Sequence, residues 1–201
     1  MMRKVFFILM MIISLNNGYS QSMKVMKSAL DFSNEIDSAG LVFTMPKGYH
    51  LVPIKTDPDL NYAFAIKHDR EAFEVRYMYW PLKDEIEQYK KCMVDTFCQM
   101  KDPNRAYVDR MTAKMAIIAG GVAPPASSFP KPELRSEMHC DDGAFVFFTP
   151  TKEYADGYSV VQTVALHKDN VADVLVVFYS KDKTRHDALM PPVFPALTFK
   201  P

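Results

Sequence analysis

The densest group of potentially reactive side chains lies between Glu137 and Asp142. It places a thiol next to an imidazole and close to carboxylates, the groups that cysteine nucleophile catalysis requires. His139 and Cys140 are adjacent, however, and neighbouring side chains on a strand point to opposite faces of a sheet. We therefore interpret the segment as a strand that enters a hairpin, with Cys140 packed or held in a disulfide. The alternative is an exported hydrolase that uses Cys140 as its nucleophile, with His139 or a distant histidine as the base.

The chain has three cysteines, Cys92, Cys98 and Cys140. The apolar pattern predicts one helix over residues 82–100, which would place Cys92 and Cys98 about 240° apart around the helix axis and about 9 Å apart along it. Because the Cα atoms of a disulfide must lie within roughly 7 Å, an intact helix prevents this pairing. Any disulfide must then include Cys140, and Cys98 is the expected partner. The odd number leaves at least one free thiol.

The sequence contains no recognised metal-binding pattern. Its histidines lie in separate segments, at His50, His68, His139, His167 and His186. They form no His-x-x-x-His pair, and the cysteines form no Cys-x-x-Cys pair. Asp57-Pro58-Asp59 and Asp141-Asp142 lack the alternating ligands of a calcium loop. Phosphate-binding loops and nucleophile elbows are absent as well. We therefore predict no metal and no cofactor, and these absences favour a non-enzymatic protein over an enzyme.

Aromatic residues gather on two segments with strand patterns, where they could form a platform for a sugar or a peptide. They are Tyr62, Phe64, Tyr77, Tyr79 and Trp80. Because large aromatic side chains dominate protein cores, we interpret them as sheet core instead. Four methionines have helical spacing, Met93, Met100, Met111 and Met115. This spacing favours core filling over an adaptable binding surface.

The first residues have the pattern of a secretory signal peptide. Arg3 and Lys4 precede an apolar run over residues 5–15, and the small residues Gly18 and Ser20 follow it. The run of about 11 residues is short for a membrane span, which needs roughly 20. We predict cleavage after Ser20 and export to the periplasm or out of the cell, with an uncleaved anchor as the alternative. The mature chain is expected to contain no membrane span.

Length and composition indicate one globular domain. The chain has 201 residues, of which 48% are hydrophobic and 24% are charged, enough for one core and unlike a disordered chain. The formal net charge is zero, so no general field attracts nucleic acid or an anionic membrane. We predict a tail or short helix over residues 21–39 and a single domain over residues 40–201.

Two predicted helices separate two groups of predicted strands. The strands are expected over residues 41–45, 50–54, 62–67, 72–80, 145–149, 158–167 and 174–179, and the helices over 82–100, 105–119 and 185–190. The first helix is expected to bury Ile86, Tyr89, Met93, Phe97 and Met100, and the second Val108, Met111, Met115, Ile118 and Ala119. Grouped strands and hairpin turns predict an α+β fold with a mainly antiparallel sheet covered by helices.

Two short segments resemble the PsbP-like family. Residues 40–49 form an apolar strand that runs into a Pro-x-Gly-aromatic turn, Pro46-Lys47-Gly48-Tyr49, and Ala196-Leu197-Thr198-Phe199 is similar to the family's terminal segment. The resemblance implies an α-β-α sandwich over roughly residues 40–200. Members include small exported bacterial proteins of unknown role, the photosystem extrinsic subunit and a nuclear-import factor that binds a small GTPase. The resemblance supplies no catalytic residues.

The functional expectation is an exported, non-enzymatic binding or accessory module of the bacterial cell envelope. Its partner would be a protein, a peptide or another envelope component. The Pro-rich loop over residues 121–132 is the expected contact surface, because loops on rigid scaffolds commonly carry binding. A purely structural envelope protein is a further alternative.

Overall fold

The computed structural model describes residues 32–54 and 59–201. The chain divides into two compact units, Met1–Ser38 and Ala39–Pro201. Residues 32–38 of the first unit are helical. The predicted signal peptide, over residues 1–20, lies outside the described residues, as does most of the predicted tail.

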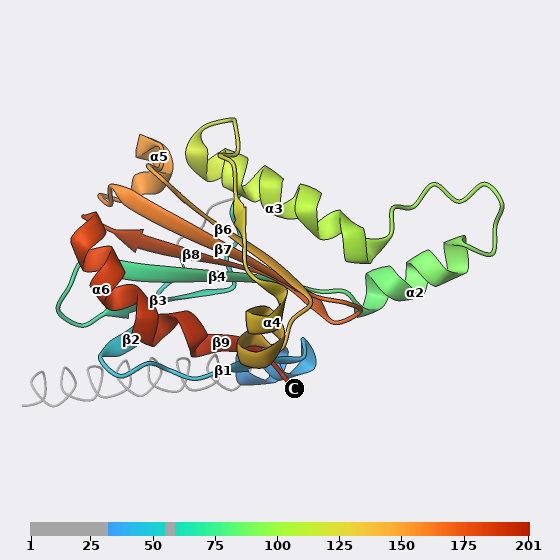
Figure 1. Cartoon of the computed structure of the whole chain (residues 1–201), viewed down its shortest axis with the longest axis horizontal. Helices are drawn as coiled ribbons and strands as arrows, with labels where there is room; N and C mark the ends of the chain where they lie inside the picture. Colours follow the sequence, from blue (N-terminus) through green and yellow to red (C-terminus); the bar gives the residue numbers. More distant parts are fainter. Residues whose placement is uncertain (1–31, 55–58) are drawn as a thin grey trace, which may run out of the picture. The chain divides into compact units, whose positions relative to one another are not determined.

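The second unit is built on a seven-stranded antiparallel sheet (Figure 1). Its strands, in spatial order, are β2 (Tyr49–Val52), β3 (Phe64–His68), β4 (Phe73–Pro81), β8 (Ala172–Ser180), β7 (Val160–Lys168), β6 (Asp142–Phe148) and β5 (Ser127–Ser128). A separate two-stranded sheet pairs β1 (Leu41–Phe43) with β9 (Leu197–Phe199). The arrangement confirms the predicted α+β fold and its antiparallel sheet.

The centre of the large sheet is the pairing of β4, β8 and β7. β4 pairs with β8 from Phe73 opposite Ser180 to Pro81 opposite Ala172. Every residue of β8 is buried, as its continuous apolar run predicts for a strand covered on both faces. β7 and β8 are joined by a tight turn in which Asn170 has a positive φ of 60°.

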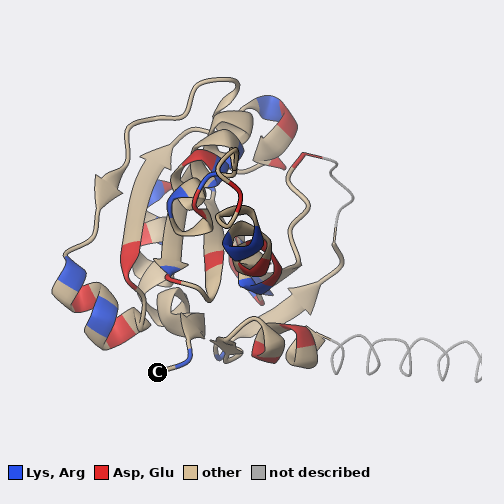
Figure 2. Cartoon of the chain, turned by 90° about the vertical axis from the view of Figure 1, so that its right-hand side faces the viewer, with Lys and Arg blue, Asp and Glu red and all other residues tan. Residues whose placement is uncertain are grey.

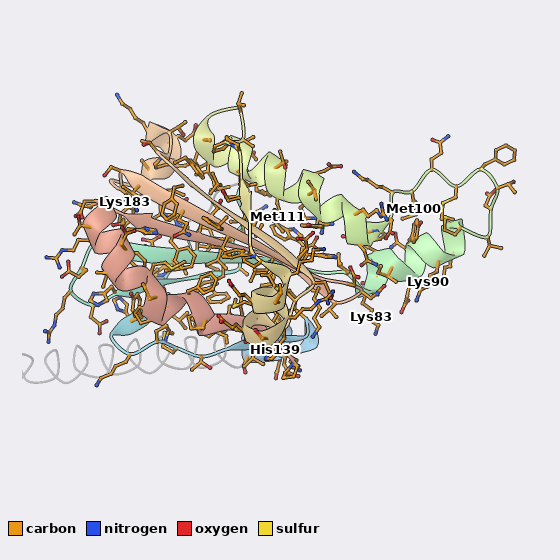
Figure 3. All side chains as sticks on the ribbon, in the orientation of Figure 1. Lys83, Lys90, Met100, Met111, His139 and Lys183 are labelled. Atoms are coloured by element: carbon orange, nitrogen blue, oxygen red, sulfur yellow. A yellow bond between two sulfur atoms is a disulfide. The ribbon has the colours of Figure 1, made fainter. Side chains whose placement is uncertain are left out.

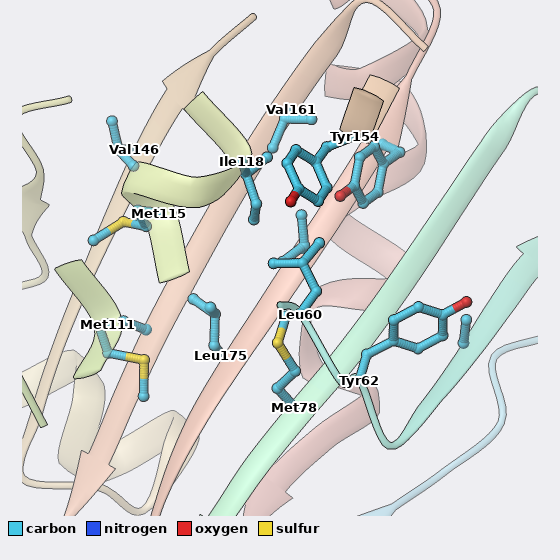
Figure 4. Packing of buried hydrophobic residues seen from close by; sticks show 14 of the residues in the cluster. Leu60, Tyr62, Met78, Met111, Met115, Ile118, Val146, Tyr154, Val161 and Leu175 are labelled. Atoms are coloured by element: carbon cyan, nitrogen blue, oxygen red, sulfur yellow. The ribbon is translucent and has the colours of Figure 1, made fainter. Parts of the chain in front are cut away.

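Helices cover both faces of this sheet. α3 (Pro103–Ala119) contributes Met111, Met115 and Ile118 to a cluster that includes Val177 of β8 (Figure 4). α6 (Lys183–Val193) places the ring of His186 against Phe178. Val177 and Phe178 are neighbours on one strand and point to opposite faces. The two helices therefore lie on opposite faces, which makes a helix–sheet–helix sandwich.

The remaining helical segments are short. They are α2 (Lys83–Cys92), α4 (Lys131–Glu133), η1 (Leu134–Met138), α5 (Lys152–Ala155) and η2 (Phe194–Ala196). None of the helices in the described part of the chain is long and apolar enough to cross a membrane.

Local sequence sets both ends of α3. The side chain of Asp102 accepts a hydrogen bond from the backbone N–H of Asn104 at 3.0 Å, and Pro103 occupies the first turn, a favoured pair of start signals. At the other end Gly120 adopts the left-handed conformation, with φ of 91°. A side chain there would also collide with Thr151. The predicted end of this helix at Gly120-Gly121 is therefore confirmed.

The helix predicted over residues 82–100 is wrong beyond Cys92. After α2 ends, the N–H of Asp95 donates to the carbonyl of Cys92 at 2.8 Å, and the N–H of Cys98 donates to the carbonyl of Asp95 at 3.1 Å. The Asp95 side chain accepts from the N–H of Phe97 at 2.9 Å. Such local bonds compete with helix formation. Met93, Phe97 and Met100 are consequently exposed instead of buried.

Two further expectations differ from the structure. Val108 was expected on the inner face of the second helix but is exposed, whereas Met111, Met115 and Ile118 are buried as predicted. The segment before Cys140 was expected to be a strand. It is instead the π-helical turn η1, and the strand begins only at Asp142.

Candidate functional site

A disulfide closes the turn that follows α2. Cys92 and Cys98 are bonded with their Cα atoms 5.3 Å apart, inside the usual range for disulfides. The prediction that any bridge must use Cys140 is therefore wrong. It assumed a continuous helix, and the turns at residues 93–98 bring the two cysteines together. Cys140 is the free cysteine, and it is buried.

The Cys92–Cys98 loop presents apolar side chains to solvent. Val94 is 87% exposed and Phe97 is 85% exposed. Figures 1 and 3 show the loop beyond the end of α2, on the segment that leads away from the sheet and back to α3. Two large apolar residues exposed to this degree within one disulfide-closed loop are the candidate binding site of the described chain.

The start of α2, the helix that leads to the loop, packs against the rest of the second unit. Leu82 and Ile86, at the start of α2, are buried. The guanidinium of Arg110 on α3 donates to both carboxylate oxygens of Glu85 on α2, at 2.8 and 2.9 Å, and also pairs with buried Asp173 on β8. One side chain thus connects the start of α2 with α3 and with the sheet.

Charged residues flank the exposed apolar residues in the sequence. Lys90 and Lys91 lie in the last turn of α2, and Asp95 lies between Val94 and Phe97. Figure 2 shows the chain from the side on which this segment lies, with lysines and acidic residues together on the helix. The loop therefore offers two apolar groups, one carboxylate and a basic flank.

The expected contact surface, residues 121–132, is partly incorporated into the fold. Ser127 and Ser128 form β5, which pairs with β6 at the edge of the sheet. The ring of Phe129 packs against Phe145 at a centroid distance of 4.8 Å. Val122 is 83% exposed, so the beginning of this loop still offers a large apolar group to a partner.

The cluster around Cys140 does not form a nucleophilic site. His139 has a positive φ of 55°, and the Sγ atom of Cys140 lies 3.9 Å from the carbonyl oxygen of Leu134. Burial, together with the charges of Asp141 and Asp142, raises the pKa of the Cys140 thiol to about 12. The thiolate is the nucleophilic form, and almost none is present at neutral pH.

The histidines have separate environments. Both ring nitrogens of buried His167 bond carboxylates, and His186 bonds Gln162 on the opposite face of the sheet. His50 pairs with Asp69 at the surface. No group of three or more His, Cys, Asp or Glu residues that could hold a metal occurs within residues 32–54 and 59–201. The candidate calcium segment at Asp57-Pro58 lies outside the described residues.

The aromatic residues on the strands are core, as predicted, and do not form a platform. Tyr62, Phe64 and Tyr77 are buried. The rings of Phe64 and Tyr77 stack with centroids 4.4 Å apart. Tyr79 and Trp80 are partly buried.

The helical spacing of Met93, Phe97 and Met100 predicts that one helix buries all three side chains. The sequence pattern therefore does not indicate the exposed loop. Asp95 and Thr96, which are weak helix formers between the two cysteines, were the available signal against a continuous helix. Comparison with known proteins adds no relative, because no family model matches the chain and none of the curated proteins matches it.

Proposed function

We propose that the protein is an exported, non-enzymatic binding module of the bacterial cell envelope, which docks to a partner protein through the Cys92–Cys98 loop. The observation that carries the proposal is the exposure of Val94 and Phe97, at 87% and 85%, on a loop closed by a disulfide. Burying each of these side chains in a partner is favourable by about 1.5–3 kcal/mol.

The disulfide makes the loop suitable for docking. A flexible loop must lose conformational freedom when it binds, and a cross-link removes part of that freedom in advance. The binding energy of interfaces is commonly concentrated in a few side chains that fill pockets on the partner. Phe97 and Val94, within one short closed loop, can serve as anchors of this kind.

The chemistry of the loop favours a protein over a lipid bilayer as the occupant. Asp95 lies between Val94 and Phe97, so insertion of the tip into lipid would also bring a carboxylate toward the apolar phase at a high cost. A protein pocket can pair that carboxylate with hydrogen-bond donors. Lys90 and Lys91 favour an acidic rim on the same partner.

Export is part of the proposal. Stable disulfides are typical of oxidising compartments outside the cytoplasm, and the Cys92–Cys98 bridge supports the signal peptide proposed over residues 1–20. The PsbP-like resemblance also remains a proposal. Its two matching segments correspond to the region of β1 and β9, which pair with each other.

No observation favours the alternative of an exported hydrolase. Its proposed nucleophile, Cys140, is buried and has a pKa raised to about 12 by burial and by the carboxylates of Asp141 and Asp142. A non-enzymatic role is therefore the better supported of the two.

The test is site-specific photocrosslinking in the producing cell. A photoreactive phenylalanine analogue replaces Phe97 in one variant and Val122 in a control variant, because both side chains are more than four-fifths exposed. We expect a discrete protein adduct from position 97 that disappears when Val94→Ser or Cys92→Ser/Cys98→Ser is added. Position 122 should give no such adduct.

Other outcomes would overturn the proposal in defined ways. An adduct from position 122 alone would move the contact surface to residues 121–132. Adducts to phospholipid from position 97 would replace the protein partner with a membrane surface. The absence of any adduct at either position would favour a purely structural role.

A further inference from the structure

A second feature lies at the opposite end of β4 from α2 (Figure 1). It is an open cleft of about 420 Å³, lined by residues 67–72 at the β3–β4 hairpin, residues 156–158 before β7, and Lys181 after β8. This volume is within the range of small-molecule sites. Charged and polar side chains dominate the lining, which fits a hydrophilic ligand.

The acidic side chains of the cleft already accept bonds from basic partners. Asp69 bonds the Nδ1 atom of His50 at 2.7 Å, and Glu71 lies 3.4 Å from the guanidinium of Arg185. Asp156 pairs with the guanidinium of Arg76. Each acid therefore has its own partner before any ligand enters.

Buried groups beneath the cleft hold this arrangement in place. Arg76 and Glu74 are both buried and bond each other at 2.8 Å. The hydroxyl of Tyr158 donates to the other oxygen of Glu74 at 3.4 Å. The guanidinium of Arg76 also lies over the ring of Tyr179, 4.3 Å from its centroid. Asp156 and Tyr158 are thus both bonded to side chains of β4.

The basic side chains that line the cleft are not paired with oppositely charged groups in this way. In the described part of the chain, Lys67, Arg70 and Lys181 have no ion-pair partner within 4.0 Å and no side-chain hydrogen bond. The ring of His68 also lines the cleft. Its Nδ1 atom accepts from the N–H groups of Arg70 and Glu71, at 3.2 and 3.0 Å.

We propose that this cleft binds the oxyanion group, carboxylate or phosphate, of a small hydrophilic molecule. Three cationic side chains and the ring of His68 line a cleft whose own carboxylates already have basic partners. Charge-assisted hydrogen bonds of this kind are among the stronger polar contacts in proteins. The cleft and the Cys92–Cys98 loop are separated by the length of β4, nine residues or about 30 Å, so the two proposals stand independently.

The test is a titration of the isotope-labelled protein with inorganic phosphate and, separately, with citrate, followed by NMR. Sodium chloride at matched ionic strength is the reference. We expect saturable shifts of the backbone signals of residues 67–72 and 156–158. The stronger of the two anions identifies the preferred oxyanion.

Four variants make the test specific. Lys67→Gln and Lys181→Gln should each weaken binding about tenfold, the effect of one charge-assisted hydrogen bond. Lys131→Gln, on α4, makes the same change in net charge away from the cleft and should have no effect. Glu71→Gln removes a competing carboxylate and should tighten binding, an effect that misfolding cannot produce.

The proposal is overturned if neither anion shifts these signals beyond the chloride reference. It is also overturned if Lys131→Gln weakens binding as much as Lys67→Gln, because the attraction would then be a general surface effect. Photocrosslinking at position 97 is unaffected by either result, which keeps the two proposals distinguishable.

Discussion

The imidazole of His167 is buried and lies parallel to the ring of Tyr107, with centroids 4.4 Å apart. Its Nδ1 atom bonds Asp173 at 2.6 Å and its Nε2 atom bonds Asp169 at 2.9 Å. Burial opposes protonation of the ring, but the hydrogen bonds and charges of the two carboxylates outweigh it and raise the pKa of His167. The native state therefore holds this proton more tightly than the unfolded chain does.

The raised pKa of His167 predicts a defined pH dependence of stability. The stabilisation is fully present below the unfolded pKa of about 6.5 and is lost as the pH rises through the higher native pKa. The difference in unfolding free energy between the wild type and His167→Gln should therefore shrink as the pH is raised above about 6.5. Urea denaturation at a series of pH values measures it. A difference that is constant with pH would contradict the assigned bonds.

His186 provides the matched control for this measurement. Burial lowers the pKa of His186, so the native state resists protonation of this ring. Its contribution to stability is present above about 6.5 and is lost as the pH falls toward the lower native pKa. The difference between the wild type and His186→Gln should consequently change with the opposite sign to that of His167→Gln.

Among single residues, the predicted core is confirmed where a helix packs on the sheet and is wrong beyond the end of α2. Met111, Met115 and Ile118 were assigned correctly because helical spacing alone places them on one face. The burial of Glu74 and Arg76 was not foreseen, because a charged residue within an alternating strand normally faces solvent. Asp156, which pairs with Arg76, is far away in sequence, and no local pattern connects the two.

At the scale of elements, α2 and its loop show the limit of periodicity. Ile86 and Tyr89 continue into Met93, Phe97 and Met100 with helical spacing, yet the helix ends at Cys92. Periodicity indicates which residues could share a face, but a helix gains most of its stability from packing that face against a partner. The end of α2 lacks such a partner, and local bonds with the disulfide determine the chain path there.

The pairing of the cysteines is directly testable by alkylation and intact mass. In the unfolded chain without reductant, only the thiol of Cys140 should react, because Cys92 and Cys98 are bonded. In the folded protein Cys140 should react very slowly, since it is buried and its pKa is raised to about 12. Rapid labelling of Cys140 in the folded protein, or a peptide linking Cys98 to Cys140, would contradict the structure.

At the scale of the whole molecule, Arg110 joins α2, α3 and the sheet through Glu85 and Asp173. Asp173 is completely buried, whereas the side chain of Glu85 is 42% exposed. Removing one partner of a buried ion pair leaves an uncompensated charge, whereas breaking an exposed pair has little effect. The two partners of Arg110 should therefore differ greatly in their influence on stability.

We expect Arg110→Met to lower the free energy of unfolding by about 2–3 kcal/mol, because buried Asp173 would keep only His167 as a basic partner. Glu85→Gln should lower it by less than about 1 kcal/mol. Chemical denaturation of both variants measures the difference. Equal losses would show that Asp173 is not stabilised mainly by Arg110.

Local patterns in the sequence predict the fold class and most of the elements. Strands such as β8 and hairpin turns such as residues 168–171 follow from local patterns of apolar and turn residues, and Gly120 ends α3 because it adopts a conformation that other residues avoid. These features depend on neighbours in the chain, so the sequence contains the information directly.

The pairing of the cysteines and the position of both candidate sites depend on tertiary contacts. Whether residues 93–100 stay helical depends on whether the fold offers them a packing surface, and it does not. The cleft combines residues 67–72, 156–158 and Lys181, which come together only because β4, β8 and β7 are adjacent in the sheet. Contacts between distant segments follow from the order of the strands, and no spacing within one segment encodes that order.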